Sequence, residues 1–306
     1  MQSFEHSFSA MGGPCKIHIE CQQERTALAA LSAAEAEVRR LESKYSRYLS
    51  NSITSSINSS AGIAPVAIDE ETAGLLNYAD TVWQESAGLF DLTSGVLRHA
   101  WDFRSGLIPE ARLIESLLAK VGWQRLQWTQ SSAFLTEPGM ELDFGGCVKE
   151  YAADSAASIL RSNTIEHALV NLAGDLASVG GQGSGQPWTI GVRHPQSRNQ
   201  AAASLELVDQ ALASSGDYER FIEFEGKRYG HILNPLTGWP VQGLAAVSVT
   251  GPQCLVAGSA ATLAMLKPEN EALKWLHTLG LPWVAVNYRG QAFSADGPGG
   301  SQFESE

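Results

Sequence analysis

Apolar residues recur with two different periods along the chain, and together these periods predict a mixture of strands and helices. Alternating apolar and polar residues within 4–20 predict one or two extended segments, with a loop at 10–14. Helical spacing predicts a long amphipathic helix over 26–48, with an apolar face formed by Leu28, Leu31, Val38, Leu41 and Tyr45. The same criteria predict further helices over 70–86, 110–121, 254–266 and 269–278, and further strands within 124–144, 167–172, 187–193, 204–209, 211–215, 221–224, 228–233, 247–249 and 283–288.

The order of these elements indicates the fold class. Many non-sequential strands with helices between them favour an α+β fold, built mainly of antiparallel sheets with packed helices, over a doubly wound parallel sheet. The chain has 306 residues, which is enough for two domains, but no linker divides it. We therefore expect residues 1–295 to form a single domain, with two interlocked subdomains as an allowed variant. The tail at 296–306, rich in Gly, Ser and acidic residues, is expected to be disordered.

The stretch 141–157 is predicted to form a strand, a glycine turn and a helix in succession. Its first residues alternate as in a short half-buried strand, and its last residues repeat small and apolar types at helical spacing. Between them, Gly145 and Gly146 allow the backbone to approach a partner closely. Such a turn directs N–H groups toward an anion such as a phosphate, and Asp143 and Lys149 flank it with opposite charges. From these residues alone, a tight turn with a surface lysine is the competing interpretation.

Composition narrows the classes of function. A formal net charge of −12 without a basic run argues against a non-specific nucleic-acid binder. No apolar run approaches the roughly 20 residues of a membrane span. The N-terminus as given carries no export signal, so we expect a cytoplasmic protein, or a periplasmic one if the native N-terminus was trimmed. Cysteine spacing does not suit a metal site, and we expect reduced thiols at Cys15, Cys21, Cys147 and Cys254.

A series of short motifs follows in order from about residue 8 to about residue 290. The motifs are Met11-Gly12, Tyr45-Ser46-Arg47-Tyr48 with Asn58, 90–95, Trp101-Asp102-Phe103, 143–154, 171–175, 215–218, 231–238 and Ala261-Thr262. No motif is specific by itself, but their order is hard to obtain by chance. In this order they resemble the ApbE family, the FAD:protein FMN transferases.

The resemblance implies the α+β fold that these enzymes share and a specific reaction. Family members use Mg²⁺ and transfer FMN from FAD to a Thr or Ser hydroxyl of an acceptor flavoprotein, releasing AMP. Displacement at a pyrophosphate phosphorus needs positive charge on the oxygens, in-line positioning and a proton acceptor. Two alternatives also use FAD: a binding protein without transfer activity, and a pyrophosphatase that gives FMN and AMP by delivering FMN to water.

The resemblance also implies roles for individual residues. Residues that would contact the cofactor are Met11 and Tyr48 against the flavin or adenine, Leu89, Phe90 and Asp91 along it, and Asp143 and Lys149 at its polar groups. The implied metal ligands are the carbonyl of Gly146 and the hydroxyl of Thr262. His231 would lie close to the phosphates and is the candidate catalytic base, because its intrinsic pKa lies near physiological pH.

Each role has a plainer alternative. Core packing is the alternative for Met11 and Tyr48, helix capping for Asp91, and surface exposure for Lys149. For His231 it is the capping of backbone carbonyls. For Asp175, the second candidate base, it is a hydrogen bond to its own turn.

The chain departs from the family pattern in the metal-binding segment. The family places an acid four residues before the threonine, but that position holds Gly258 here. Mg²⁺ prefers carboxylate and phosphate oxygens. We therefore expect a weak metal site that depends on the FAD phosphates to complete its shell.

Overall fold

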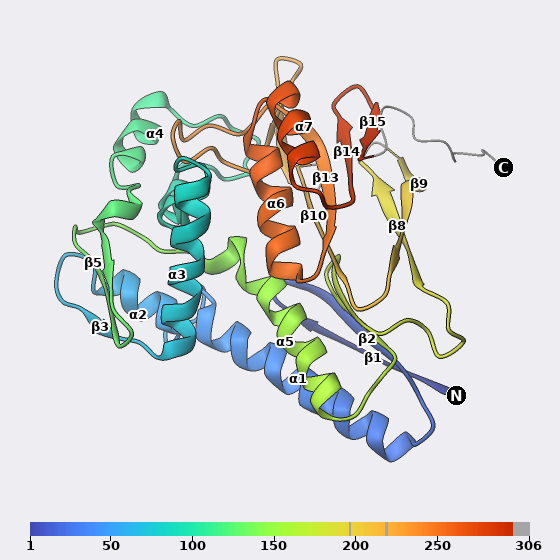
Figure 1. The fold of residues 1–306 in the computed structure, drawn as a ribbon. Coiled ribbons are helices and arrows are strands. Elements are labelled where there is room, and N and C mark those ends of the chain that lie inside the picture. Colours follow the sequence, from blue (N-terminus) through green and yellow to red (C-terminus); the bar gives the residue numbers. More distant parts are fainter. Residues whose placement is uncertain (196, 218–219, 296–306) are drawn as a thin grey trace. The chain divides into compact units, whose positions relative to one another are not determined.

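The computed structural model describes residues 1–195, 197–217 and 220–295 (Figure 1). Contacts form two compact units, each assembled from separate stretches of chain. Unit 1 comprises Met1–Glu42, Cys147–Gly216 and the chain from Gly243 onward, and unit 2 comprises Ser43–Gly146 and Asp217–Gln242. The tail predicted at 296–306, and Tyr218 of the 215–218 motif, lie outside the described residues.

Unit 1 is built on an eight-stranded sheet in which all neighbouring strands are antiparallel. Across the sheet the strands are β1 (Gln2–Ala10), β2 (Gly13–Cys21), β6 (Ala168–Leu172), β7 (Asp175–Val179), β10 (Ala211–Gly216), β13 (Leu244–Gly251), β14 (Trp283–Asn287) and β15 (Ala292–Ser294). The middle strands β7 and β13 are buried along their whole length. Their uninterrupted burial indicates that both faces of the sheet are covered.

Helices cover one face of this sheet and a β-ribbon covers the other (Figure 1). α5 (Val148–Ser162) and α6 (Cys254–Leu266) pack on the central strands, and α7 (Glu269–Thr278) packs on α6 and β14. The ribbon consists of β8 (Trp188–His194) and β9 (Ser197–Leu207). Its Trp188 and Leu207 pack with Leu176, Leu212 and Val286 of the sheet. Alternate residues of a strand point to opposite faces of a sheet, so Leu176 and Leu212 face the ribbon and point away from α5 and α6.

The first two strands form a tighter hairpin than the predicted loop at 10–14. Pairing continues to Ala10 opposite Gly13, so the turn contains only Met11 and Gly12. Both have positive φ, +52° and +75°, as a two-residue hairpin turn with the right twist requires. A Cβ on Gly13 would lie 2.6 Å from Cβ of Ala173, so glycine is needed there as well.

The long helix α1 (Glu24–Tyr45) confirms the predicted element but shifts its buried face. The buried residues include Ala27, Ala30, Leu31, Ala34, Val38 and Leu41, whereas Leu28 is 55% exposed. The prediction that Leu28 belongs to the apolar face was therefore wrong. Alanines, which are weak hydrophobic signals in a sequence, complete the stripe instead of Leu28 because they allow close packing.

Unit 2 combines short helices with two small antiparallel sheets. Its helical segments are α2 (Ile53–Ser59), α3 (Glu70–Glu85), η1 (Leu92–His99), α4 (Ala111–Leu118), η2 (Trp123–Arg125) and η3 (Phe144–Gly146). Its strands are β3 (Val66–Ala67), β4 (Leu126–Trp128) and β5 (Ser132–Leu135) in one sheet and β11 (Phe221–Phe224) and β12 (Lys227–Gly230) in the other. With unit 1, this arrangement of helices and antiparallel sheets confirms the predicted α+β class.

The predicted strand at the start of 141–157 was wrong, although its burial pattern was right. Leu142 and Phe144 are fully buried, but neither belongs to a strand. The side-chain amide of Asn58 takes the place of a neighbouring strand: its Nδ2 donates to Leu142 O at 2.9 Å, and Leu142 N donates to its Oδ1 at 2.7 Å. Asp143 N donates to Leu92 O at 2.9 Å. Side-chain and loop partners thus satisfy a backbone that alternates like a strand.

Asp69 caps α3 and provides a test of the local electrostatics of unit 2. Its Oδ1 accepts from Thr72 N at 3.0 Å, and its Oδ2 accepts from Lys44 Nζ at 2.5 Å. Burial alone would raise the pKa of Asp69, but the hydrogen bonds from Lys44 and Thr72 outweigh it and lower the pKa to about 2. The charged form is therefore the one that stabilises the fold.

We expect Asp69→Asn, which keeps a cap acceptor but loses the charge, to be less stable than wild type at pH 6. The side chain is 58% exposed, so the deficit should be no more than about 1 kcal/mol. Because the folded pKa lies below the ordinary value of about 3.9, the deficit should shrink as pH falls from about 4 toward 2. Urea unfolding at several pH values measures it. A deficit that stays constant down to the lowest pH at which both proteins fold would contradict the assignment.

Candidate functional site

The predicted site residues are distributed over both units. Unit 1 contains Met11, Lys149 and Thr262, and unit 2 contains Tyr48, Leu89, Phe90, Asp91, Asp143, Gly146 and His231. Each unit therefore holds its own set of candidate residues.

In unit 2, Arg47 joins Tyr48 and Asp143 into one polar cluster. Arg47 Nη1 bonds to Asp143 Oδ2, and Arg47 Nη2 donates to Tyr48 Oη at 2.8 Å. The guanidinium carbon also lies 5.0 Å from the centroid of the Tyr48 ring. Burial alone would lower the pKa of Arg47, but the interactions with Asp143 and Tyr48 together outweigh burial and raise the pKa. Tyr48 is 77% exposed, which excludes core packing as the explanation for this ring.

The loop that carries Asp143 is fixed by glycines. Asp143 Oδ1 accepts a hydrogen bond from Gly145 N at 2.9 Å. A Cβ on Gly95 would lie 2.6 Å from Cβ of Asp143, so only glycine allows the 90–95 motif to approach this loop. The nearest side-chain atoms to a Cβ on Gly146 would be those of the buried Phe90 ring, at 3.8 Å. Phe90 therefore lies beside the Gly146 backbone, and Leu89 next to it is half-buried.

Asp91 forms the N-cap of η1 with its own carboxylate. Oδ1 accepts from Thr93 N at 2.7 Å and from Thr93 Oγ1 at 2.6 Å, and Oδ2 accepts from Trp123 N at 3.2 Å. Burial raises the pKa of Asp91 against the effect of these hydrogen bonds. Both oxygens thus hold the protein's own loops together, as the helix-cap alternative predicted, and contact with the cofactor stays a prediction.

His231 directly follows β12 and begins an irregular hairpin. Val241 N donates to Ile232 O at 3.0 Å and Asn234 N donates to Trp239 O at 2.9 Å, which ties the two sides of the hairpin together. The tip is anchored by Trp101, whose Nε1 donates to Gly238 O at 2.9 Å. The Trp101 ring also packs on Phe103, Tyr229 and Trp239. The Trp101-Asp102-Phe103 motif therefore positions the segment that carries the half-buried imidazole.

In unit 1, Met11 lies at the tip of the β1–β2 hairpin. Its backbone N donates to Oε1 of Glu42 at 2.6 Å, and its side chain is half-buried. The hydrogen bond stabilises a left-handed backbone that most residues other than glycine avoid. The conformation thus fixes the position from which the thioether extends.

Lys149 lies in the first turn of α5 and pairs with Asp175 at the start of β7. Its Nζ lies 2.7 Å from Asp175 Oδ2, with the lysine side chain 28% exposed and the aspartate 2% exposed. Asp175 Oδ1 accepts from Ser214 N of β10 at 3.3 Å, so it bridges strands instead of closing its own turn. Burial alone would lower the pKa of Lys149, but Asp175 and Glu150 outweigh it and raise the pKa, so the lysine is charged.

Glu150 is the residue next to Lys149, and its carboxyl group is buried. The residue is 8% exposed, and within residues 1–195, 197–217 and 220–295 its Oε2 finds no hydrogen-bond partner. Burial, and secondarily the nearby Asp175 carboxylate, raises the pKa of Glu150 to about 8, with Lys149 acting in the opposite direction. Gly258 of α6 lies against this side chain: a Cβ there would be 2.5 Å from Cγ of Glu150. Thr262 follows one helical turn later on the same face of α6 and is half-buried.

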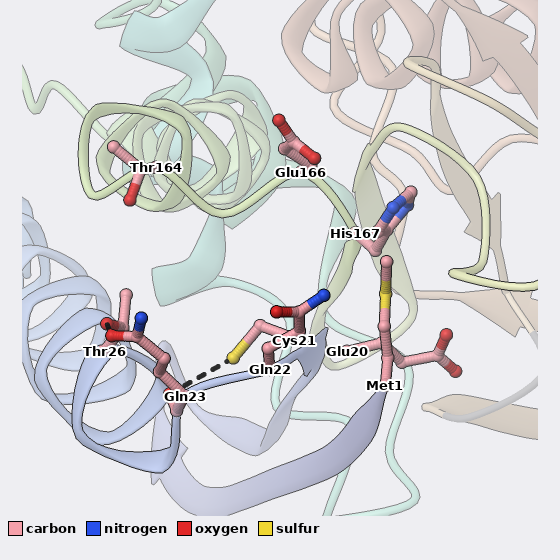
Figure 2. A pocket seen from close by; sticks show the side chains of 9 residues that line it. All are labelled: Met1, Glu20, Cys21, Gln22, Gln23, Thr26, Thr164, Glu166 and His167. Carbon is pink, nitrogen blue, oxygen red and sulfur yellow. Dashed lines mark hydrogen bonds between the residues drawn. The ribbon is translucent and has the colours of Figure 1, made fainter.

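In the part of the chain that the structure describes, no group of three or more His, Cys, Asp or Glu side chains is arranged to hold a metal, and no helix has the length and apolar character to cross a bilayer. The four cysteines are free, as predicted. A pocket of about 300 Å³ in unit 1, drawn in Figure 2, contains none of the predicted site residues. It is lined by Met1, Glu20, Cys21, Gln22, Gln23, Thr26, Thr164, Glu166 and His167.

Comparison with known proteins decides the family. The sequence model of the ApbE family matches residues 11–284. The chain belongs to the ApbE family. It is similar to an FAD:protein FMN transferase of Klebsiella pneumoniae, with 33% identity over 82% of this chain and 78% of the relative. Another relative, the FAD:protein FMN transferase of Salmonella typhimurium, is 30% identical over 81% of this chain and 74% of its own.

Solved ApbE structures share the fold. The crystal structure of the ApbE protein of Thermotoga maritima has a TM-score of 0.87 and 27% identity and covers 95% of this chain and 96% of its own. The apo form of the flavinyl transferase ApbE of Pseudomonas stutzeri has a TM-score of 0.85 and 25% identity, with 98% of both chains covered. The predicted resemblance to the ApbE family is thus confirmed, and the chain is a transferase.

Two residues of this ApbE chain were given no role by the sequence. Arg47 was part of a recognised motif, but the sequence did not show that it pairs with Asp143. Glu150 lies in the first turn of α5, where an acid is favourable without any further role. A signal for its burial was present, because Ala153, Ala157 and Leu160 follow it at helical spacing and are all buried.

Proposed function

We propose that this ApbE protein transfers FMN from FAD to a Thr or Ser hydroxyl of an acceptor flavoprotein and releases AMP. The observation that carries the proposal is that relatives named FAD:protein FMN transferase match 82% and 81% of the chain at 33% and 30% identity. The ordered motifs of the sequence, which contain the candidate residues of both units, support the same activity.

The proposed reaction is a displacement at phosphorus. The acceptor hydroxyl oxygen forms a new bond to the FMN phosphorus, and the bond from that phosphorus to the bridging oxygen breaks. The bridging oxygen leaves with AMP, and the hydroxyl proton passes to a base. His231 is our candidate for this base. The hydrogen-bonded hairpin holds the half-buried residue in place, and imidazole is a side chain that can accept a proton near neutral pH.

The other candidate residues would bind and orient FAD. Exposed Tyr48, held by Arg47, offers a flat ring for stacking on the flavin or adenine. Lys149 is charged and partly exposed, so its ammonium can face a phosphate while Asp175 holds it in place. Holding the pyrophosphate still lowers the entropic part of the barrier.

A hard divalent cation, which the family implies, fits the residues of unit 1. Such ions prefer oxygen ligands. Unit 1 offers two: the buried Glu150 Oε2, which accepts no hydrogen bond from the described residues, and the hydroxyl of Thr262. When bound, Mg²⁺ would neutralise charge that develops on the pyrophosphate oxygens. The carbonyl of Gly146 stays a prediction as a ligand.

Incubation with FAD and Mg²⁺, with and without an acceptor domain, tests the proposal. Transfer predicts AMP release that requires the acceptor and leaves the acceptor fluorescent from covalent FMN. A pyrophosphatase would release AMP and free FMN without an acceptor. An FAD-binding protein without activity would bind FAD and release no AMP under either condition.

Tyr48→Ala is expected to weaken FAD binding by about tenfold or more. The reason is that base–aromatic stacking contributes on the order of 1–3 kcal/mol in nucleic-acid complexes, and about 1.4 kcal/mol is a factor of ten. Quenching of flavin fluorescence measures the dissociation constant. Tyr48→Phe is the matched control: it keeps the ring, loses only the hydrogen bond from Arg47, and should bind nearly as well as wild type. An unchanged dissociation constant for Tyr48→Ala would remove this ring from the site.

A further inference from the structure

One oxygen of the buried Glu150 carboxyl group, Oε2, has no hydrogen-bond partner within the described part of the chain. A buried carboxyl group is costly unless it is paired or hydrogen-bonded. Oε2 of Glu150 accepts no hydrogen bond among the described residues, and the neighbouring Lys149 ammonium lies 2.7 Å from Asp175. One ammonium thus serves two buried carboxyl groups. The Glu150 Oε2 atom is therefore a buried oxygen that remains available to a ligand.

The space beside Glu150 is reserved by a glycine on the facing helix. Gly258 is buried in the interior of α6, where glycine is unfavourable compared with alanine. A Cβ at this position would lie 2.5 Å from Cγ and 2.8 Å from Oε1 of Glu150. The Glu150 side chain therefore occupies the volume into which a side chain at 258 would extend. The two residues are complementary, because a side chain at 258 would have to displace that of Glu150.

Another acid near this helix already accepts two hydrogen bonds. Asp154, one turn after Glu150 on α5, accepts from Cys254 N at 2.7 Å and from Leu255 N at 3.0 Å. It thereby satisfies two N–H groups at the start of α6. These two bonds fix α6 against α5, whereas Glu150 Oε2, on the side chain that lies against Gly258, accepts no hydrogen bond from the described residues.

We propose that Glu150 supplies the carboxylate ligand of the divalent-metal site, in the place that the glycine at 258 leaves open. The proposal rests on the proposed function, which implies the metal. It replaces the expectation of a site without a protein carboxylate: the acid is present but comes from α5 instead of α6. Thr262, one turn after Gly258, carries a hydroxyl on the same face of the helix.

Mn²⁺ binding, followed by the electron paramagnetic resonance signal of the free ion, tests the proposal without measuring activity. Mn²⁺ takes the same oxygen ligands as Mg²⁺. Wild type, Glu150→Gln and the control Glu271→Gln, an exposed acid on α7, are titrated with and without saturating FAD, and FAD alone is the blank. We expect Glu150→Gln to lose at least about tenfold in Mn²⁺ affinity, as loss of a supporting metal contact commonly does. The control should match wild type.

Moving the carboxylate back to α6 is the decisive variant. In Glu150→Gly/Gly258→Asp the volume vacated on α5 can accept the new side chain on α6, so Mn²⁺ affinity should return to within about threefold of wild type. Gly258→Asp alone should lower the melting temperature because its Cβ meets Glu150. If Glu150→Gln does not fold, the exchange variant decides by itself: binding supports the proposal, and a folded exchange variant without Mn²⁺ affinity overturns it. Unchanged Mn²⁺ affinity in folded Glu150→Gln also overturns it.

Failure of this proposal can be told from failure of the proposed function. If AMP release requires the acceptor in wild type while Glu150→Gln keeps full Mn²⁺ affinity, the transferase proposal stands and the ligand proposal falls. If Mn²⁺ affinity depends on Glu150 but wild type releases no AMP with any acceptor, the ligand proposal stands and the transferase proposal falls.

Discussion

Lys149→Ala is expected to lower the free energy of unfolding by about 3–5 kcal/mol at pH 7, because it leaves the Asp175 carboxylate buried without its counter-ion. Asp175 is 2% exposed and lies 2.7 Å from the lysine Nζ. Among the described residues, Asp175 also accepts a hydrogen bond from Ser214 N at 3.3 Å, which cannot balance a buried charge. Urea unfolding of wild type and variant measures the loss.

The size of this effect separates a buried ion pair from an exposed lysine. Arg40→Ala is the matched control, since Arg40 pairs with Glu37 at 2.8 Å on α1 with the arginine side chain 46% exposed. It should change the free energy of unfolding by no more than about 1 kcal/mol. The double variant Lys149→Ala/Asp175→Asn should recover part of the loss, because the amide carries no charge. A loss for Lys149→Ala as small as for Arg40→Ala would show that the lysine is an ordinary surface charge.

His231→Asn is expected to reduce the rate of FMN transfer by about a hundredfold or more while FAD affinity stays the same. Loss of a general base commonly costs a factor of about a hundred to ten thousand. Asparagine keeps a polar side chain of similar reach but cannot accept a proton near neutral pH. Single-turnover AMP release with a saturating acceptor gives the rate, and flavin fluorescence gives the affinity.

Two other results would redirect this assignment. If transfer and FAD affinity fall in equal proportion, His231 binds the pyrophosphate, and the base must be sought elsewhere, with Asp175 the next candidate. If neither changes, His231 has no role in the reaction. His277→Asn, on the exposed end of α7, is the control for a general effect of losing an imidazole and should leave both quantities unchanged.

Much of the fold could be predicted because its signals are local. Helices α6 and α7 occupy the predicted residues, 254–266 and 269–278, because proline at 268 separates two well-defined runs. The α+β class followed from the order of strands and helices. The family followed from short motifs. Some of their glycines are required because a larger residue would collide with a neighbour, as at Gly95, which lies against Asp143. The pattern at 142–144 correctly predicted that Leu142 and Phe144 are buried. The predicted strand was wrong, because the side-chain amide of Asn58 takes the place of the expected neighbouring strand.

The sequence by itself determined the family, the candidate residues and the absence of an acid at 258. Only the tertiary structure decided what stands beside that glycine, because the packing of α5 on α6 brings Glu150 against a position far from it in the chain. The same holds for Arg47 with Asp143 and for Lys149 with Asp175. A residue's type fixes the charge that it can carry, but the distance to its partner and its removal from water fix the energy of that charge. Both quantities arise from segments that meet only in the folded chain.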